Sequence, residues 1–440
     1  MLAETGDNPR ASACPHVPTR FCSREGSRRA GPPAFRIEHV QRAVSDRILK
    51  RRKRRTLSRR PRNLFACLAL CILGSVHWGT SSVRAEPYLA IQEGYKCSQC
   101  HVNMTGGGKR TDFANIYTQT RLAGTFFDWR SFTPKPGEDA DKDNPVKTDS
   151  QSSFFTGRLN DYVAIGGDFR VLYDKTKTSG VPSKDAFTQR KQNVYLEVDL
   201  IPDHAVFYQT LADGGDAREI FGLLKGELKG EPFYLKAGQF FLPYGLRLQD
   251  DTAVTRAVTG FTYGTTDVGV ELGFEPGPMA LHIAATNGTG SSLETNHSKR
   301  LTGSLAYVHR RFRAGGSYSE NRDAQGVKTK IYGGHAGAQF GRVGILAEAA
   351  VIDDSTVKQR VSILEFNLLL SRGNNLKFSY EYHDPSLAVF ENARVRYSLV
   401  YEPFLNQFTQ MRVGVRDKRG IPQNAELNAN EYFLELHLFF

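Results

Sequence analysis

The residues best suited to chemistry in this chain are Cys97-Ser98-Gln99-Cys100-His101, two thiols separated by two residues with a histidine directly after the second. This is the spacing of a c-type haem attachment site. In such a site both thiols bond covalently to the porphyrin, and the histidine is an axial ligand of the iron. The sequence therefore predicts one covalent haem c, held by Cys97, Cys100 and His101.

The second axial ligand of that iron is not evident in the sequence around the haem site. No other histidine lies between Glu86 and Gln151, and Met104 is the only methionine there. An extended chain covers roughly 3.3–3.6 Å per residue, so the three residues after His101 reach about 10–11 Å, which is marginal for passing around the macrocycle. Four histidines of the later strands are further candidates, and an open sixth position is the alternative. These histidines are His282, His335, His383 and His437.

Two other uses of the paired thiols are a disulfide and a zinc site. The four remaining cysteines all precede Glu86, in a part of the chain expected to be removed. An exported protein with only two cysteines has no disulfide framework. A zinc site would need a second Cys/His pair nearby, which is missing. Export and the adjacent His101 both favour haem.

The strong positive charge belongs to the start of the chain. The net charge is +12, and the first 62 residues hold 17 Lys/Arg against 5 Asp/Glu, so the remainder is neutral. The basic run 50–55 could be read as a nucleic-acid patch. However, an apolar stretch, 64–78, follows it at once, and Val83-Arg84-Ala85 is a small-residue cleavage site. Residues 48–85 are therefore predicted to be a secretory signal peptide, and no nucleic-acid partner is expected.

The rest of the N-terminal third divides by composition. Residues 1–47 have no periodic apolar pattern and are expected to be disordered or to precede the true start. Residues 86–132 are predicted to form a small, mostly helical monohaem cytochrome c segment, with a helix over 111–122. Residues 133–154 are polar and proline-rich, which is typical of a linker.

Residues 155–440 are predicted to form a membrane-spanning β-barrel. Apolar and polar side chains alternate with period two, as in the last strand, where Leu434, Leu436 and Leu438 alternate with Glu435 and His437. Charges on an inner face and large apolar groups outside are typical of an outer-membrane barrel. A soluble β-sandwich is the alternative. Sixteen candidate strands start near 162, 191, 205, 218, 232, 267, 278, 299, 311, 327, 342, 356, 374, 390, 407 and 430.

The connections between these strands alternate in length, with tight turns at one end and longer loops at 175–190, 242–266, 288–298, 384–389 and 418–429. Short periplasmic turns and long outer loops follow the barrel rule. In the longest loop, Asp250 and Asp251 either gather cations or form a solvated acidic pair.

Two resemblances extend this interpretation. The segment 236–246 (KAGQFFLPYGL) resembles the phosphate-selective porins O and P, which are 16-stranded and whose third outer loop folds into the pore. That barrel behind Cys97–His101 is similar to the fused monohaem cytochrome c–porins of iron-oxidising bacteria. The resemblance covers about 86–440. The chain departs from that family in having Asn103-Met104-Thr105-Gly106 after the haem site, where the family has a proline, which bears on the iron substrate more than on the haem.

The resemblance implies an outer-membrane electron conduit, an Fe(II):cytochrome c oxidoreductase in enzymatic terms. Electrons from an extracellular donor such as Fe(II) would reach a periplasmic carrier through the haem, in a barrel surrounded by outer-membrane lipid and able to form a homotrimer. The alternative is an anion or phosphate porin with a haem-bearing plug or sensor, in which Arg394, Arg396 and Arg412 select anions. A haem peroxidase is a weaker reading, since nothing marks a distal acid–base pair.

Overall fold

The computed structural model describes residues 86–122, 154–211, 218–290, 294 and 296–440. They belong to one compact unit, Gly79–Phe440. The expected extension 1–47, the signal peptide 48–85 and all but the last residue of the linker 133–154 lie outside the described residues. Within the described part of the chain, no helix has the length and apolar character needed to cross a membrane.

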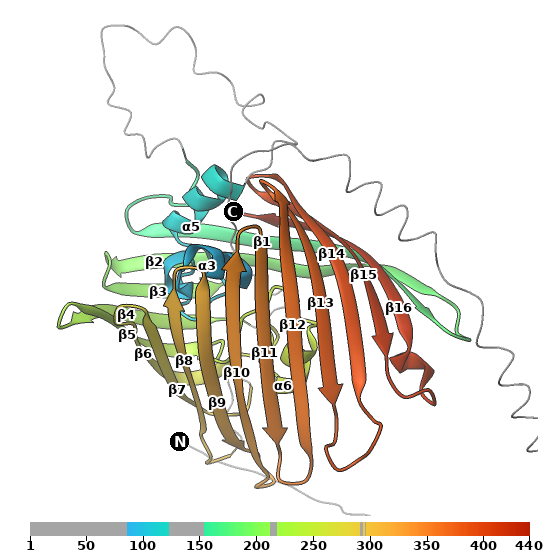
Figure 1. Ribbon diagram of the computed structural model, residues 1–440. Helices are drawn as coiled ribbons and strands as arrows, with labels where there is room; N and C mark the ends of the chain where they lie inside the picture. The colour runs from blue at the N-terminus through green and yellow to red at the C-terminus, as the bar shows by residue number, and fades with distance from the viewer. Residues whose placement is uncertain (1–85, 123–153, 212–217, 291–293, 295) are drawn as a thin grey trace, which may run out of the picture. The chain divides into compact units, whose positions relative to one another are not determined.

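Sixteen antiparallel strands close into a barrel, which confirms the predicted fold class (Figure 1). Each strand pairs with its neighbours in sequence, and β1 pairs with β16. The strands are β1 (Val163–Thr178), β2 (Lys184–Ile201), β3 (Ala205–Thr210), β4 (Ile220–Leu228), β5 (Glu231–Phe240), β6 (Asp267–Phe274), β7 (Met279–Thr286), β8 (Arg300–His309), β9 (Phe312–Arg322), β10 (Lys328–Phe340), β11 (Val343–Asp353), β12 (Lys358–Ser371), β13 (Asn374–Asp384), β14 (Arg394–Asn406), β15 (Thr409–Arg419) and β16 (Ala429–Phe439).

The strand faces are sorted as the alternating pattern requires. In β16, Glu435 and His437 are buried toward the lumen, whereas Leu434, Leu436 and Leu438 are exposed on the outer face. A charged interior and an apolar exterior in a closed barrel with an even number of antiparallel strands are the pattern of bacterial outer-membrane barrels. The chain is therefore an outer-membrane barrel protein, and the soluble sandwich is excluded.

The hairpin of β1 and β2 departs from the prediction. A loop was expected over 175–190, but β1 continues to Thr178 and β2 begins at Lys184. Tyr173 and Phe187 lie opposite each other in the register, with ring centroids 4.9 Å apart. Cross-strand aromatic pairs stabilise antiparallel ladders. This stretch therefore stays paired although its polar composition is typical of a loop.

A helical plug, defined here as residues 86–122, occupies the lumen at the end of the barrel with the short turns. Its elements are α3 (Pro87–Glu93), α4 (Cys97–Cys100), α5 (Asp112–Tyr117) and a π-helical turn (Thr118–Leu122). Proline opens α3, and Gly94 ends it in the left-handed conformation with φ of 72°. A Cβ on Gly94 would lie 3.2 Å from Cα of Arg310 in the β8–β9 turn, so glycine allows the plug to approach the wall. By the barrel rule this end faces the periplasm.

The long loop between β5 and β6, 241–266, folds inward, as the resemblance implied. It contains α6 (Val254–Thr259), which lies inside the barrel in Figure 1. The loop is held to the wall by Glu348 of β11, which accepts from the backbone of Leu246 at 3.0 Å and is ion-paired with Arg256. The lumen is thus bounded by the plug from one side and by this loop from the other.

Candidate haem-binding site in the barrel lumen

The predicted haem-attachment residues lie inside the barrel. Cys97 and Cys100 begin and end α4, so their side chains are one turn apart on the same helical face, and both are free thiols. His101 ends the helix with an extended backbone. Ser98 fastens α4 to the wall, because its hydroxyl donates to Glu275 at 2.7 Å in the turn before β7.

The chain after His101 folds back in a short hairpin. His101 pairs with Arg110 as an isolated β-bridge, and the amide of Val102 donates to the carbonyl of Lys109 at 3.1 Å. The turn is formed by three consecutive glycines, 106–108, all with positive φ. A Cβ on Gly108 would lie 2.4 Å from the hydroxyl oxygen of Tyr208. The glycines therefore let the hairpin lie directly against the barrel wall.

A cavity opens beside Cys97, Cys100 and His101, between the plug and the inward-folded loop. It has about 1590 Å³ of atom-free space, part of it open to solvent, and its lining comes from the plug, the loop and strands on several sides of the barrel. The cavity is thus within the lumen and not on the surface.

Three arginines line this cavity without a carboxylate partner among the described residues: Arg110 of the plug, Arg247 of the loop and Arg313 of β9. Arg110 lies over the ring of Phe439 at 4.1 Å. Arg247 donates to a backbone carbonyl at 2.9 Å, and Nη1 of Arg313 is 3.9 Å from the sulfur of Cys97. Burial lowers the pKa of Arg110 and of Arg247. Buried positive charges that have no ion-paired carboxylate favour an anionic ligand.

The protonation of the attachment residues also suits a haem. Burial, reinforced by the charge of Arg110, lowers the pKa of His101 to about 4, so its imidazole is neutral as a metal ligand must be. Its Nδ1 is buried without a hydrogen bond among the described residues. Burial raises the pKa of Cys100 to about 12, so this thiol is protonated. The thiols, the neutral imidazole, the cavity and the uncompensated arginines together fit a porphyrin with two carboxylates.

The alternative use of the thiols, a zinc site, has no set of ligands among the described residues. They contain no group of three or more His, Cys, Asp or Glu side chains arranged to hold a metal ion. A tetrahedral zinc site needs such a set.

The five candidates for the distal ligand separate into two groups. Met104 packs into a cluster of wall side chains and, like His335 and His383, does not line the cavity. His282 and His437 do line it. His282 has Ser304 Oγ at 3.3 Å and Glu275 Oε1 at 3.2 Å. The distal ligand stays a prediction, which the structure narrows to these two histidines or an open position.

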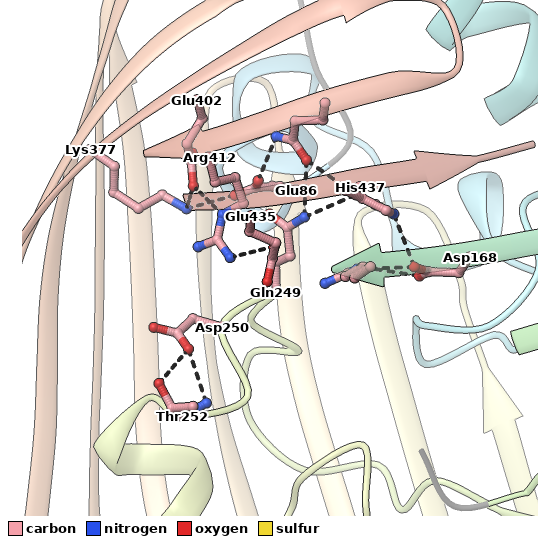
Figure 2. A network of polar contacts seen from close by, with 12 residues as sticks. Glu86, Asp168, Gln249, Asp250, Thr252, Lys377, Glu402, Arg412, Glu435 and His437 are labelled. Carbon is pink, nitrogen blue, oxygen red and sulfur yellow. Dashed lines mark hydrogen bonds and ion pairs between the residues drawn. The ribbon is translucent and has the colours of Figure 1, made fainter. Parts of the chain in front are cut away.

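His437 belongs to a polar network that fastens the plug to the barrel (Figure 2). Its Nε2 lies 3.0 Å from Asp168, and its Nδ1 lies 3.3 Å from Gln410. Gln410 also contacts the carboxylate of Glu86, the first described residue of the plug, at 3.4 Å. Glu86 is ion-paired with Lys377 of β13 at 2.7 Å.

Further buried polar contacts hold the plug on other sides of the barrel. Lys109 is ion-paired with Glu197 of β2 at 2.8 Å. The side-chain amide of Asn103 donates to Glu219 at 2.5 Å and accepts from Lys236 at 3.0 Å. Lys109 is therefore engaged by the wall, and Arg110, not Lys109, is left to face the cavity. The anchors surround the plug, so it is fixed within the lumen.

The loop acids do not form a cation site. Asp250 is ion-paired with Arg416 at 2.8 Å and with Arg396 at 3.5 Å. Asp251 accepts from the backbone amide of Tyr263 at 2.9 Å. The same pairing neutralises Arg396, and Arg412 is likewise paired with Glu402 and Glu435 at 3.0 Å each. The aspartates are therefore not free to gather cations, and Arg396 and Arg412 are not free to select anions. Arg394 is exposed at the end of β14.

The CxxCH motif is evident in the sequence, whereas the three arginines that line the same cavity are not. Arg247 and Arg313 lie 150 and 216 positions from Cys97 along the chain, and neither has a local pattern that marks it. These two arginines could have been identified only by knowing which strands face one another across the lumen.

No protein-family model matches the chain, and no curated protein matches its sequence. Solved porin structures are similar to it in fold. OprB of Pseudomonas putida has a TM-score of 0.49 at 12% identity, covering 64% of this chain and 95% of its own. An anion-selective porin from Comamonas acidovorans has a TM-score of 0.48 at 10% identity, covering 63% of this chain and 99% of its own. OmpF of Salmonella typhi, solved with daunomycin, has a TM-score of 0.47 at 11% identity, covering 63% of this chain and 97% of its own.

Proposed function

We propose that this outer-membrane barrel is an electron conduit in which Cys97, Cys100 and His101 hold one covalent haem c inside the lumen. A haem supplies a one-electron redox centre, which the bilayer alone lacks. The extracellular donor would be a small reductant such as Fe(II), and the acceptor a periplasmic carrier. The observation that supports the proposal is that the CxxCH helix lies beside a lumen cavity lined by three arginines that have no ion pair among the described residues.

Different residues of the chain would have different roles in holding the haem. Cys97 and Cys100 tether the porphyrin, and His101 supplies the proximal nitrogen. Arg110, Arg247 and Arg313 offer positive charge to the two carboxylates and to the redox centre. The inward loop lies on the outer side of the cavity, and the extent to which a haem is buried is one of the factors that set its potential.

The alternative, an anion or phosphate porin with a haem-bearing plug or sensor, requires an open path for solute. The plug is anchored by buried polar contacts to β2, to β5 and to β13. The expected selectivity arginines, Arg396 and Arg412, are ion-paired with carboxylates. These contacts favour the conduit over the porin. A homotrimer stays a prediction.

The decisive experiment mixes the purified haem-loaded protein with Fe(II) under anaerobic conditions and follows the haem absorbance. Prompt reduction is expected for a conduit. The protein reconstituted in a planar bilayer should also show little phosphate conductance. A haem that stays oxidised, together with a large phosphate conductance, would instead establish the porin.

Replacement of Arg247 by methionine is expected to lower the haem midpoint potential by tens of millivolts. A buried positive charge stabilises the reduced state, so its removal stabilises the oxidised state. For a one-electron couple about 59 mV corresponds to a tenfold change in the equilibrium constant. A spectroelectrochemical titration measures the shift. Arg342→Met, in the exposed β10–β11 turn, is the matched control and should leave the potential unchanged.

A further inference from the structure

The periplasmic mouth of the barrel has an aromatic patch that leads from the cavity to the surface. Tyr95, Phe113 and Tyr117 form a triad with ring centroids 5.4 to 6.1 Å apart. Tyr95 and Tyr117 line the cavity beside Cys100. Phe113 is 44% exposed. The triad is therefore a continuous aromatic surface between the candidate haem site and the periplasm.

Three exposed arginines lie beside this patch, and we call them the mouth arginines: Arg121, Arg311 and Arg372. They come from the π-helical turn of the plug, the β8–β9 turn and the β12–β13 turn. None is ion-paired within 4 Å to a carboxylate of the described residues. The charges of Arg121 and Arg311 both act on Glu93, a half-buried residue of α3.

Two of the mouth arginines, Arg311 and Arg372, lie in barrel turns and interact with the plug. Nη2 of Arg372 donates to the backbone carbonyl of Thr120 in the plug at 2.5 Å. Arg311 and Arg121 share their electrostatic contact with Glu93, which also belongs to the plug. Arginines that bind lipid phosphates would point outward from the barrel. The contacts with the plug therefore favour a partner in the periplasm over an anionic lipid.

Two acidic residues near Phe113 are already ion-paired. Asp112 and Asp199 are both bound by Arg158, at 2.9 Å and 2.8 Å. Asp112 and Asp199 are thus held by Arg158, whereas the mouth arginines have no ion pair among the described residues. Arginine and exposed aromatic side chains are also the residue types enriched at the energetic centres of protein interfaces.

We propose that the Tyr95–Phe113–Tyr117 patch and the mouth arginines form the docking face for a soluble periplasmic electron carrier whose own docking surface is acidic. This inference rests on the proposed conduit function and names the chemistry of the partner. Opposite charges steer the encounter, and the exposed aromatic edge places the partner next to the cavity. The contact is expected to be transient and dependent on ionic strength.

The test uses two soluble c-type cytochromes as probes, one with an acidic haem edge and one with a basic haem edge. Each is passed over the immobilised haem-loaded barrel in nanodiscs of zwitterionic lipid, and the association rate is measured over a range of salt concentrations. Reversal of the mouth arginines (R121E/R311E/R372E) should slow association of the acidic probe by about tenfold or more and weaken its salt dependence. Lys229→Glu, an exposed reversal in the β4–β5 turn, is the control and should have little effect.

Several outcomes would overturn the docking face. Equal association of the acidic probe with the parent and the triple variant is one. A second is that the triple substitution reduces the binding of anionic lipid by the barrel and leaves the association of the acidic probe unchanged. A third is binding that appears only when the acidic run of residues 138–143 is neutralised, since the occupant would then be a segment of this chain. Reduction of the haem by Fe(II), measured on the same samples, separates these failures from a failure of the conduit itself.

Discussion

Replacing Cys97 and Cys100 together by alanine is expected to abolish covalent haem, from one per chain to none. The two thiols are the only cysteines among the described residues, so no other side chain there can form the thioether bonds. Haem staining on a denaturing gel and the mass of the intact chain both measure the loss. The barrel itself should still fold, because its closure depends on strand pairing and neither cysteine takes part in it.

Ser98→Ala is the matched control, since Ser98 lies between the two cysteines on α4. It removes one hydrogen bond to the carboxylate of Glu275, a kind that typically contributes about 1.5–3 kcal/mol, and leaves both thiols in place. Full haem content is therefore expected. Haem staining that persists in the double alanine variant would contradict covalent attachment at α4.

Replacement of Lys377 by methionine is expected to loosen the plug. The ammonium of Lys377 lies 2.7 Å from Glu86 of the plug and 3.2 Å from Glu402 of the wall (Figure 2). Removing one partner of a buried ion pair leaves an uncompensated charge, at a cost of about 3–5 kcal/mol. This should weaken the binding of the plug to the barrel wall. Limited proteolysis should therefore cut residues 86–122 at a lower temperature while the barrel stays intact. Bilayer conductance should rise in parallel.

Arg360→Met provides the comparison for that variant. Arg360 forms an exposed contact with Asp384 at 3.9 Å in the neighbouring strands, and exposed pairs contribute little. Its plug should stay protected. Unchanged protection and conductance in Lys377→Met would show that the buried network does not hold the plug.

Much of the barrel could be predicted from the sequence because a strand carries its orientation locally. Side chains alternate between lipid and lumen with period two, so residues such as Leu434 and Glu435 reveal their faces without any knowledge of the neighbouring strand. Strand ends were less certain. The outer part of the β1–β2 hairpin has the polar composition of a loop, and it stays extended because β1 pairs there with both β2 and β16, with Tyr173 opposite Phe187.

The candidate site was predictable only in part, for a related reason. The spacing of Cys97, Cys100 and His101 is a property of five consecutive residues, and in this chain they form one helical turn and its end. The partners of these residues are not local. Glu275 and Arg313 reach α4 because the barrel closes around the plug, which no short window of sequence encodes.

By itself, then, the sequence determined the alternating strands and predicted haem attachment at the CxxCH motif, because both depend on side chains a few residues apart. The tertiary structure alone decided that the attachment helix lies within the lumen, that Lys109 is paired while Arg110 faces the cavity, and that His282 and His437 reach it whereas His335 and His383 do not. The physical reason is closure of the sheet, since joining β1 to β16 brings together charges from distant parts of the chain and settles which of them find a counterion.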